Sequence, residues 1–230
     1  MKEQSSGLYA QTMAECGFLT LAFDPSYTGE SGGEPRNVAS PDINTEDFSA
    51  AVDFLIAHPN VDAKRIGIIG ICGFGGMGLN AAAMDTRIKA TVASTMYDMS
   101  RVNANGYFDA EDSAEVRRNK REAMNAIRTR DAQNGTATPG TPGLPTSIKG
   151  DEPQFVKDYF DYYKTERAFH ARAINSNGAW NPTMALSFIN MPLLTYIHEI
   201  DNAVLLIHGE NAHSRYFSED AFKRRSEEHT

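Results

Sequence analysis

Short apolar runs alternate with amphipathic stretches along the first hundred residues. The run 65–71 (RIGIIGI) has the pattern of a strand that is buried on both faces of a parallel sheet. The runs 18–24 (FLTLAFD) and 87–95 (RIKATVAST) also predict strands. Apolar residues at helical spacing fill the intervals, and these segments are 3–16, 48–57 and 77–84. The order α, β, α, β, α, β predicts an α/β fold with a doubly wound, mostly parallel sheet.

Glycine and polar positions mark the ends of these helices. Gly17 is placed to stop the first helix. Thr45 is expected to cap the next helix, which closes at His58 before a proline. The polar connection 25–44 follows a predicted strand, where doubly wound folds place their ligand crevice.

The alternating pattern stops near residue 99 and returns near residue 201. Between these points we predict a charged helix over 110–133 and an aromatic-rich helix over 151–165. The tract 134–150 between them is rich in Gly, Pro, Thr and Ser, so we expect it to be mobile.

These features suggest a core that is interrupted by an insertion. We interpret residues 1–99 as the first part of the core and 100–200 as an inserted helical lid. Residues 201–230 return to the core with a strand over 202–209 and a helix over 215–226.

The glycine-rich turn after the run 65–71 carries the candidate chemistry. Residues 70–76 (GICGFGG) break the strand, and an Ala-rich helix follows at once. Strand, abrupt turn and helix are the context of a nucleophile elbow, which places Cys72 at its tip. Gly70 and Gly73 relieve crowding around a strained backbone. The new helix aims the Gly73 N–H at charge that develops on the thiolate or on a substrate.

Two alternatives to this interpretation stay open. Phe74 stands where a small residue is usual, so Gly75 and Gly76 would have to make the close contact between helix and strand. In the other register Phe74 lies at the tip, where it can do no chemistry. A lone cysteine after a buried strand can also be a small core hydrophobe.

Composition narrows the class of protein. The 230 residues suit one α/β domain with a sizeable core, and the net charge of −8 argues against a nucleic-acid partner. No window approaches 18 consecutive apolar residues, so we expect a cytoplasmic protein without a membrane partner.

Cys16 and Cys72 lie in predicted buried segments without metal-type spacing, and we predict no metal or cofactor. We expect Cys16 to be shielded and Cys72 to be the reactive thiol.

Four segments in this order resemble the α/β-hydrolase superfamily, and within it the dienelactone-hydrolase-like group that often uses cysteine. They are residues 21–33, 70–76, 94–100 and 205–218. The resemblance covers nearly the whole chain. It implies a hydrolase or acyl transferase that acts on a small ester, lactone or thioester, and it leaves the oligomeric state open.

The resemblance also implies roles for particular residues. It makes Cys72 the nucleophile and the Gly73 amide one donor of the oxyanion hole. Glu210, which follows the last predicted strand, is the candidate acid of the triad. Asp98 is the runner-up for that role and is otherwise expected to cap a turn.

Two parts that this superfamily supplies have no counterpart in the chain. The loop with the second oxyanion donor would precede residue 1, and the histidine base would follow one more strand, so we expect a chain truncated at both ends. His213 and His229 are the first candidates for a substitute base, and we interpret His208 as structural. A catalytically silent fragment or a binding module on the same fold is the alternative function.

Overall fold

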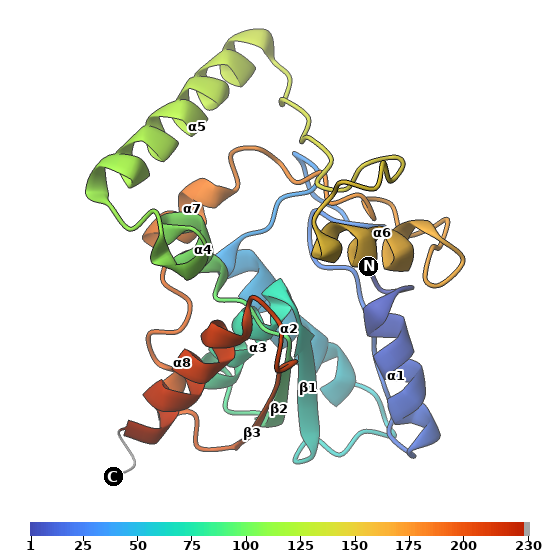
Figure 1. Cartoon of the computed structure of the whole chain (residues 1–230). Helices are drawn as coiled ribbons and strands as arrows, with labels where there is room; N and C mark the ends of the chain where they lie inside the picture. Colours follow the sequence, from blue (N-terminus) through green and yellow to red (C-terminus); the bar gives the residue numbers. More distant parts are fainter. Residues whose placement is uncertain (228–230) are drawn as a thin grey trace. The chain divides into compact units, whose positions relative to one another are not determined.

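The computed structural model describes residues 1–227, and the chain divides into two compact units (Figure 1). The first unit comprises Met1–Ala39 and Met124–Met184. The second unit comprises Ser40–Ala123 and the chain from Ala185 onward. None of the helices in residues 1–227 is long and apolar enough to cross a membrane.

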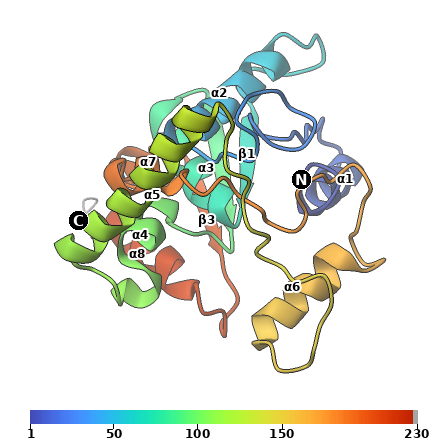
Figure 2. The same cartoon turned by 90° about the horizontal axis from the view of Figure 1, so that it is seen from above.

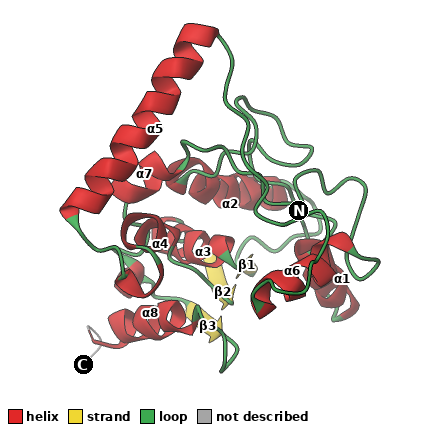
Figure 3. Cartoon of the chain, turned by 45° about the horizontal axis from the view of Figure 1, so that its top comes forward, coloured by secondary structure: helices red, strands yellow, loops and turns green. Residues whose placement is uncertain are grey.

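A parallel three-stranded sheet forms the centre of the second unit (Figure 3). Its strands are β1 (Ile66–Ile71), β2 (Ile88–Ser94) and β3 (Ala203–Ile207), in the order β1-β2-β3. In the register of the sheet, Ile69 of β1 lies beside Val92 of β2. The α/β class, the parallel sheet and these three predicted strands are confirmed.

The second unit also contains helices, of which α3 packs against the sheet. They are α2 (Pro41–Ile56), α3 (Gly73–Met84), α4 (Met99–Asn105), α7 (Ala185–Asn190) and α8 (Arg215–Glu227), with the short 3-10 helices η1 (Tyr107–Asp109) and η2 (Ile197–Glu199). α3 packs on β1 and β2, α2 packs on α3 (Figure 1), and α4 lies beside α7 (Figure 2). The fully buried side chains of the second unit include Met77 and Leu79 of α3 and Ile88 of β2. In β3, Leu205 is 55% exposed and Ile207 is 47% exposed.

The first unit contains α1 (Ser5–Glu15) and α6 (Gln154–Lys164), while α5 (Ala114–Asn134) has residues in both units. These elements confirm the helices predicted over 3–16, 151–165 and 110–133. Gly17 has a φ of 93° directly after α1, as a helix stop requires. The lid role of residues 100–200 and the mobility of 134–150 stay predictions.

The predicted strand over 18–24 is wrong. These residues have no strand assignment, and Phe18 is 55% exposed. A strand forms only when its backbone N–H and C=O groups pair with a neighbouring strand. The first unit, in its described residues, provides no such neighbour. The segment is instead anchored at its end, where the buried Asp24 carboxylate accepts from the Lys2 N–H at 2.9 Å and from Lys2 Nζ at 2.7 Å.

The predicted cap at Thr45 is also wrong, because α2 begins one turn earlier. Ser40 is the N-cap, and its side chain accepts from the Ile43 N–H. Pro41 occupies the first helical position, where its fixed φ suits a helix and its missing N–H costs nothing. Thr45 lies inside the helix and donates its hydroxyl to the Pro41 carbonyl at 2.5 Å. The helix ends at Ile56, just before His58, as predicted.

Candidate active site

Cys72 lies at the junction of β1 and α3 with a strained backbone. Its φ of 57° and ψ of −128° form a combination that residues with a side chain rarely adopt. Three backbone hydrogen bonds hold it there: its N–H donates to the Ser94 carbonyl at 3.0 Å, and its carbonyl accepts from Gly75 at 2.9 Å and from Tyr97 at 3.1 Å. Cys72 therefore occupies the tip of the elbow. The alternative register, with Phe74 at the tip, is wrong, because Phe74 lies in the first turn of α3.

Two glycines of α3 allow the helix to approach the chain after β2. A Cβ atom on Gly75 would lie 2.6 Å from the Cβ atom of Met96. A Cβ atom on Gly76 would lie 2.3 Å from the backbone oxygen of Tyr97. Real side chains do not reach such distances, so both positions require glycine. These glycines therefore make a close contact as predicted, but their closest contacts are with the chain after β2 and not with a strand.

The environment of Cys72 opposes thiolate formation. Desolvation by the surrounding protein raises the pKa of its thiol, and the Gly73 N–H, which donates to the sulfur, lowers that pKa by less. The amide is aimed as the elbow pattern predicts, but it does not outweigh the desolvation. The thiol is therefore protonated near neutral pH, and a base must take its proton before the sulfur can attack a carbonyl group.

The prediction that Cys16 is shielded is wrong. Cys16 and Cys72 are both free cysteines with exposed surface, and the Cys72 sulfur is also desolvated by the protein atoms around it. Cys16 follows directly on α1, a helix that buries none of its residues, so no packed surface covers the sulfur.

Alkylation of Cys72 is expected to require a higher pH than alkylation of glutathione. The raised pKa keeps the thiol protonated, and only the thiolate reacts, so the rate should still rise with pH after the glutathione rate has levelled off. The measurement follows iodoacetamide labelling by mass spectrometry in a Cys16→Ser background. A midpoint at or below that of glutathione would contradict the desolvation of Cys72.

One histidine and two tyrosines gather in the second unit beside this elbow. The Tyr97 hydroxyl lies 2.9 Å from His213 Nε2. The Tyr107 ring lies edge-on to both, with centroids 5.4 Å from His213 and 6.2 Å from Tyr97. Tyr97 and Tyr107 are not among the predicted site residues. The position of Tyr97 at the carboxyl end of β2 is a signal that could have identified it, whereas no local pattern marks Tyr107.

The two candidate acids lie in different surroundings. Asp98 is buried and caps α4, because its Oδ1 accepts from the Arg101 N–H at 3.0 Å and from the Ser100 hydroxyl at 2.5 Å. Asp98 therefore has a capping role, which was the predicted alternative to its role as the acid of the triad. Glu210 is exposed in the turn after β3, where its carbonyl accepts from Arg215 at 2.9 Å. The role of Glu210 as the acid stays a prediction.

His208, which was interpreted as structural, contacts two serine hydroxyls. His208 Nδ1 lies 2.7 Å from the Ser218 hydroxyl, and its Nε2 lies 3.0 Å from the Ser214 hydroxyl. Both serines are buried, so the ring of His208 ties the end of β3 to α8, in line with its interpretation as structural. His229 lies outside the described residues.

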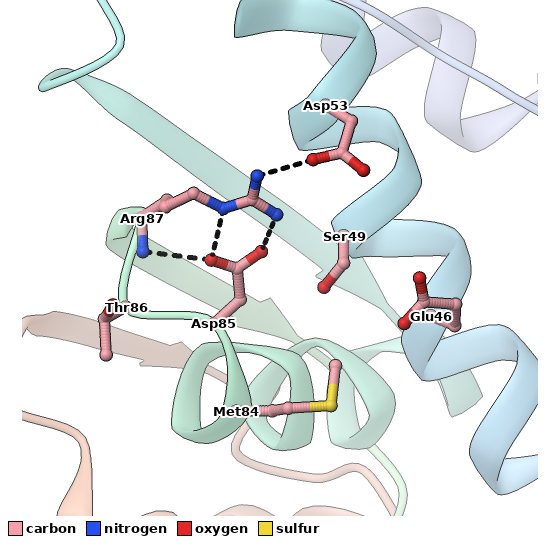
Figure 4. Close-up of a pocket in the computed structure, with 7 residues that line it drawn as sticks. All are labelled: Glu46, Ser49, Asp53, Met84, Asp85, Thr86 and Arg87. Atoms are coloured by element: carbon pink, nitrogen blue, oxygen red, sulfur yellow. Dashed lines mark hydrogen bonds and ion pairs between the residues drawn. The ribbon is translucent and has the colours of Figure 1, made fainter.

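A polar depression of about 370 Å³ lies elsewhere on the second unit (Figure 4). It is lined by Glu46, Ser49, Asp53, Met84, Asp85, Thr86 and Arg87. Arg87 donates to Asp85 through Nε and Nη2, at 2.8 and 2.7 Å, and to Asp53 at 2.5 Å. Its guanidinium group therefore ties α2 to the turn before β2. No residue of the elbow lines this depression. In residues 1–227 no cluster of His, Cys, Asp and Glu is arranged to hold a metal ion.

Comparisons with known proteins match the elbow and the sheet. A family model described as "BAAT / Acyl-CoA thioester hydrolase C terminal" matches residues 43–137, which include β1, Cys72 and β2. The uncharacterized protein PA2218 of Pseudomonas aeruginosa is 61% identical over 228 residues, which are 99% of this chain and 61% of that protein. The chain thus spans about three fifths of the length of this relative. The crystal structure of PA2218 matches with a TM-score of 0.91 and 62% identity, over 97% of this chain and 69% of that one.

Two further relatives extend the comparison. The uncharacterized protein YcjY of Escherichia coli K12 is 34% identical over 234 residues, which are 98% of this chain and 72% of YcjY. GrgF of Penicillium, named a polyketide transferase, is 37% identical over 84 residues, 36% of this chain and 29% of GrgF. Its crystal structure, named an alpha/beta hydrolase, has a TM-score of 0.70 at 19% identity, over 97% of this chain and 73% of that one, and shares the fold. The chain belongs to the family of YcjY and PA2218, and it shares the fold of an α/β hydrolase.

Proposed function

We propose that this chain carries the nucleophile of an enzyme that hydrolyses or transfers the acyl group of a small ester, lactone or thioester through an acyl-enzyme on Cys72. One observation carries the proposal. Cys72 stands at a strained strand-to-helix turn, and the Gly73 N–H donates to its sulfur. Strained backbone of this kind persists where function requires it. The donor at the sulfur is in place to move onto the carbonyl oxygen of a substrate.

The chemistry follows from these two groups. The Cys72 sulfur attacks the acyl carbonyl carbon, and the negative charge that forms on the oxygen is stabilised by the Gly73 N–H. The bond to the leaving group then breaks, which leaves the acyl group on the sulfur. Water or a second nucleophile removes it in the next step. Among the three substrate classes we favour thioesters, because the matched family model is named for acyl-CoA thioester hydrolysis and GrgF is named a transferase.

Other parts of the proposal concern the surroundings of the nucleophile. We propose Glu210 as the acid that supports the base, and residues 100–200 as the segment that selects the substrate. We also propose that the chain belongs to the dienelactone-hydrolase-like group of the superfamily. The raised pKa of Cys72 favours a second candidate function, a catalytically silent protein or a binding module on this fold.

A single-turnover experiment tests the proposal. The 230-residue chain is mixed with nitrophenyl acetate or with the acetyl thioester of N-acetylcysteamine, and released product and intact protein mass are followed together. We expect a product burst of about one equivalent, a slow steady rate and one acetyl group mapped to Cys72. A folded chain without burst or adduct would favour the silent protein.

A further inference from the structure

The side chain of Met99 lies against Gly73, the residue that follows the nucleophile. A Cβ atom on Gly73 would lie 3.1 Å from Met99 Sδ and 3.2 Å from Met99 Cγ. Real Cβ atoms seldom come so close to another atom. The thioether therefore fills the space that a side chain at position 73 would need.

Covalent geometry places this thioether near the proposed oxyanion donor. In any residue the Cβ atom lies about 2.5 Å from the backbone nitrogen of that residue, so Met99 Sδ lies at most about 5.6 Å from the Gly73 nitrogen. Gly73 is the first residue of α3, and the first N–H groups of a helix have no acceptor within the helix. An acyl oxygen that binds this N–H brings its acyl group close to Met99.

The segment that carries Met99 approaches the elbow at two further points. The Tyr97 N–H donates to the Cys72 carbonyl at 3.1 Å. A Cβ atom on Gly76 would lie 2.3 Å from the Tyr97 backbone oxygen and 3.7 Å from the Asp98 Cα atom. Three consecutive residues, 97 to 99, thus lie against the nucleophile turn or the start of α3.

Hydrogen bonds of its neighbours fix the backbone of Met99. The Asp98 Oδ1 accepts from the Arg101 N–H at 3.0 Å and from the Ser100 hydroxyl at 2.5 Å. The Ser100 oxygen in turn accepts from the Leu193 N–H at 3.1 Å. Asp98 and Ser100 are both buried, so bulk water does not compete for these bonds. Met99 itself is half-buried, as the wall of a site that a substrate enters must be.

A methionine in this place acts by its shape. The side chain is apolar and unbranched, and its sulfur is only a weak acceptor without a proton to give. It therefore contributes no proton transfer to the reaction at Cys72. It occupies space beside Gly73, and an acyl group longer than acetyl needs space of this kind.

We propose that Met99 is the specificity-determining residue of the acyl site and restricts the acyl group on Cys72 to short, unbranched chains such as acetyl. The inference rests on the proposed function of Cys72. The thioether forms one wall of the site beside Gly73, and the additional carbons of a longer chain collide with it.

The Met99→Ala chain tests the wall with two esters that share one leaving group, nitrophenyl acetate and nitrophenyl butyrate. The substitution removes the Cγ, Sδ and Cε atoms and leaves their space to the substrate. We expect the ratio of the acylation rate constants, butyrate over acetate, to rise by about tenfold or more, since one misplaced methylene already changes selectivity by about that factor. The rate constants come from the product burst, and the intact-protein mass identifies each acyl group.

Three further variants control for general damage. Met99→Leu has a similar volume and should keep the wild-type ratio. Met84→Ala removes the same atoms from a methionine that is 54% exposed at the other end of α3, and it should also keep that ratio. If Met99→Ala does not fold, Met99→Val replaces it and should give a smaller rise in the same direction. An unchanged ratio in the Met99 variant, or an equal rise in Met84→Ala, would overturn the proposal.

Alkylation of the thiol separates this proposal from the proposed function. Iodoacetamide and N-butyl iodoacetamide both place a carbonyl group near the sulfur of Cys72, and neither requires acyl transfer. Both are measured in a Cys16→Ser background. If the wild type acylates and Met99→Ala keeps its preference for acetate, the wall is overturned and the function of Cys72 stands. If the wild type does not acylate, the proposed function fails. A relative gain for N-butyl iodoacetamide in Met99→Ala then supports the wall, and no gain overturns it.

Discussion

The Cys72→Ala chain is expected to form no acyl-enzyme, and its turnover of nitrophenyl acetate should fall to the rate of the uncatalysed reaction. The sulfur at the elbow tip accepts from the Gly73 N–H, so its removal leaves the oxyanion donor without the nucleophile that it serves. Loss of a nucleophile costs on the order of a thousandfold or more. The product burst and the intact-protein mass measure this loss directly.

Two variants serve as controls for that experiment. Cys16→Ala removes the other exposed thiol and should keep the full burst, because Cys16 lies in the first unit, after α1. Cys72→Ala removes one sulfur atom and keeps a residue of the same backbone type, so its thermal unfolding should resemble that of the wild type. A Cys72→Ala chain that still shows a burst would place the nucleophile elsewhere.

The three strands of the sheet could be predicted because each has a recognisable pattern of apolar residues in its local sequence. β1 is a continuous apolar run, β2 is mainly apolar, and the two strands pair in parallel. The run 18–24 has the same local pattern, yet it forms no strand. Strand pairing is non-local. A strand requires a partner strand, and the local sequence of the strand does not determine whether such a partner is present.

The candidate site divides in the same way. The positions of Cys72 and Gly73 in a tight turn could be predicted, because the neighbouring glycines in the sequence indicate such a turn. The contact between Tyr97 and His213 joins residues 116 positions apart, and no spacing rule connects them. Such a contact appears only when the chain is folded.

Gly76→Ala is expected to destabilise the protein and to weaken the elbow. The new Cβ atom would lie 2.3 Å from the Tyr97 backbone oxygen, a group that cannot move aside as a flexible side chain can. Overpacking of this kind costs about 1–3 kcal/mol. For a chain of this length the loss corresponds to a decrease in Tm of roughly 2–12 °C, which circular dichroism measures.

The same substitution should also lower the acyl burst, and this effect distinguishes the elbow from an ordinary packed site. Relief of the clash moves Tyr97 away from α3, and the Tyr97 N–H then loses its 3.1 Å hydrogen bond to the Cys72 carbonyl. With that bond weakened, the strained φ of Cys72 is less firmly held, and a smaller fraction of the chains presents the sulfur correctly. Gly32→Ala is the matched control, because no atom lies within 4 Å of its added Cβ. If Gly76→Ala matches Gly32→Ala in both Tm and burst, the close approach of α3 to Tyr97 does not exist.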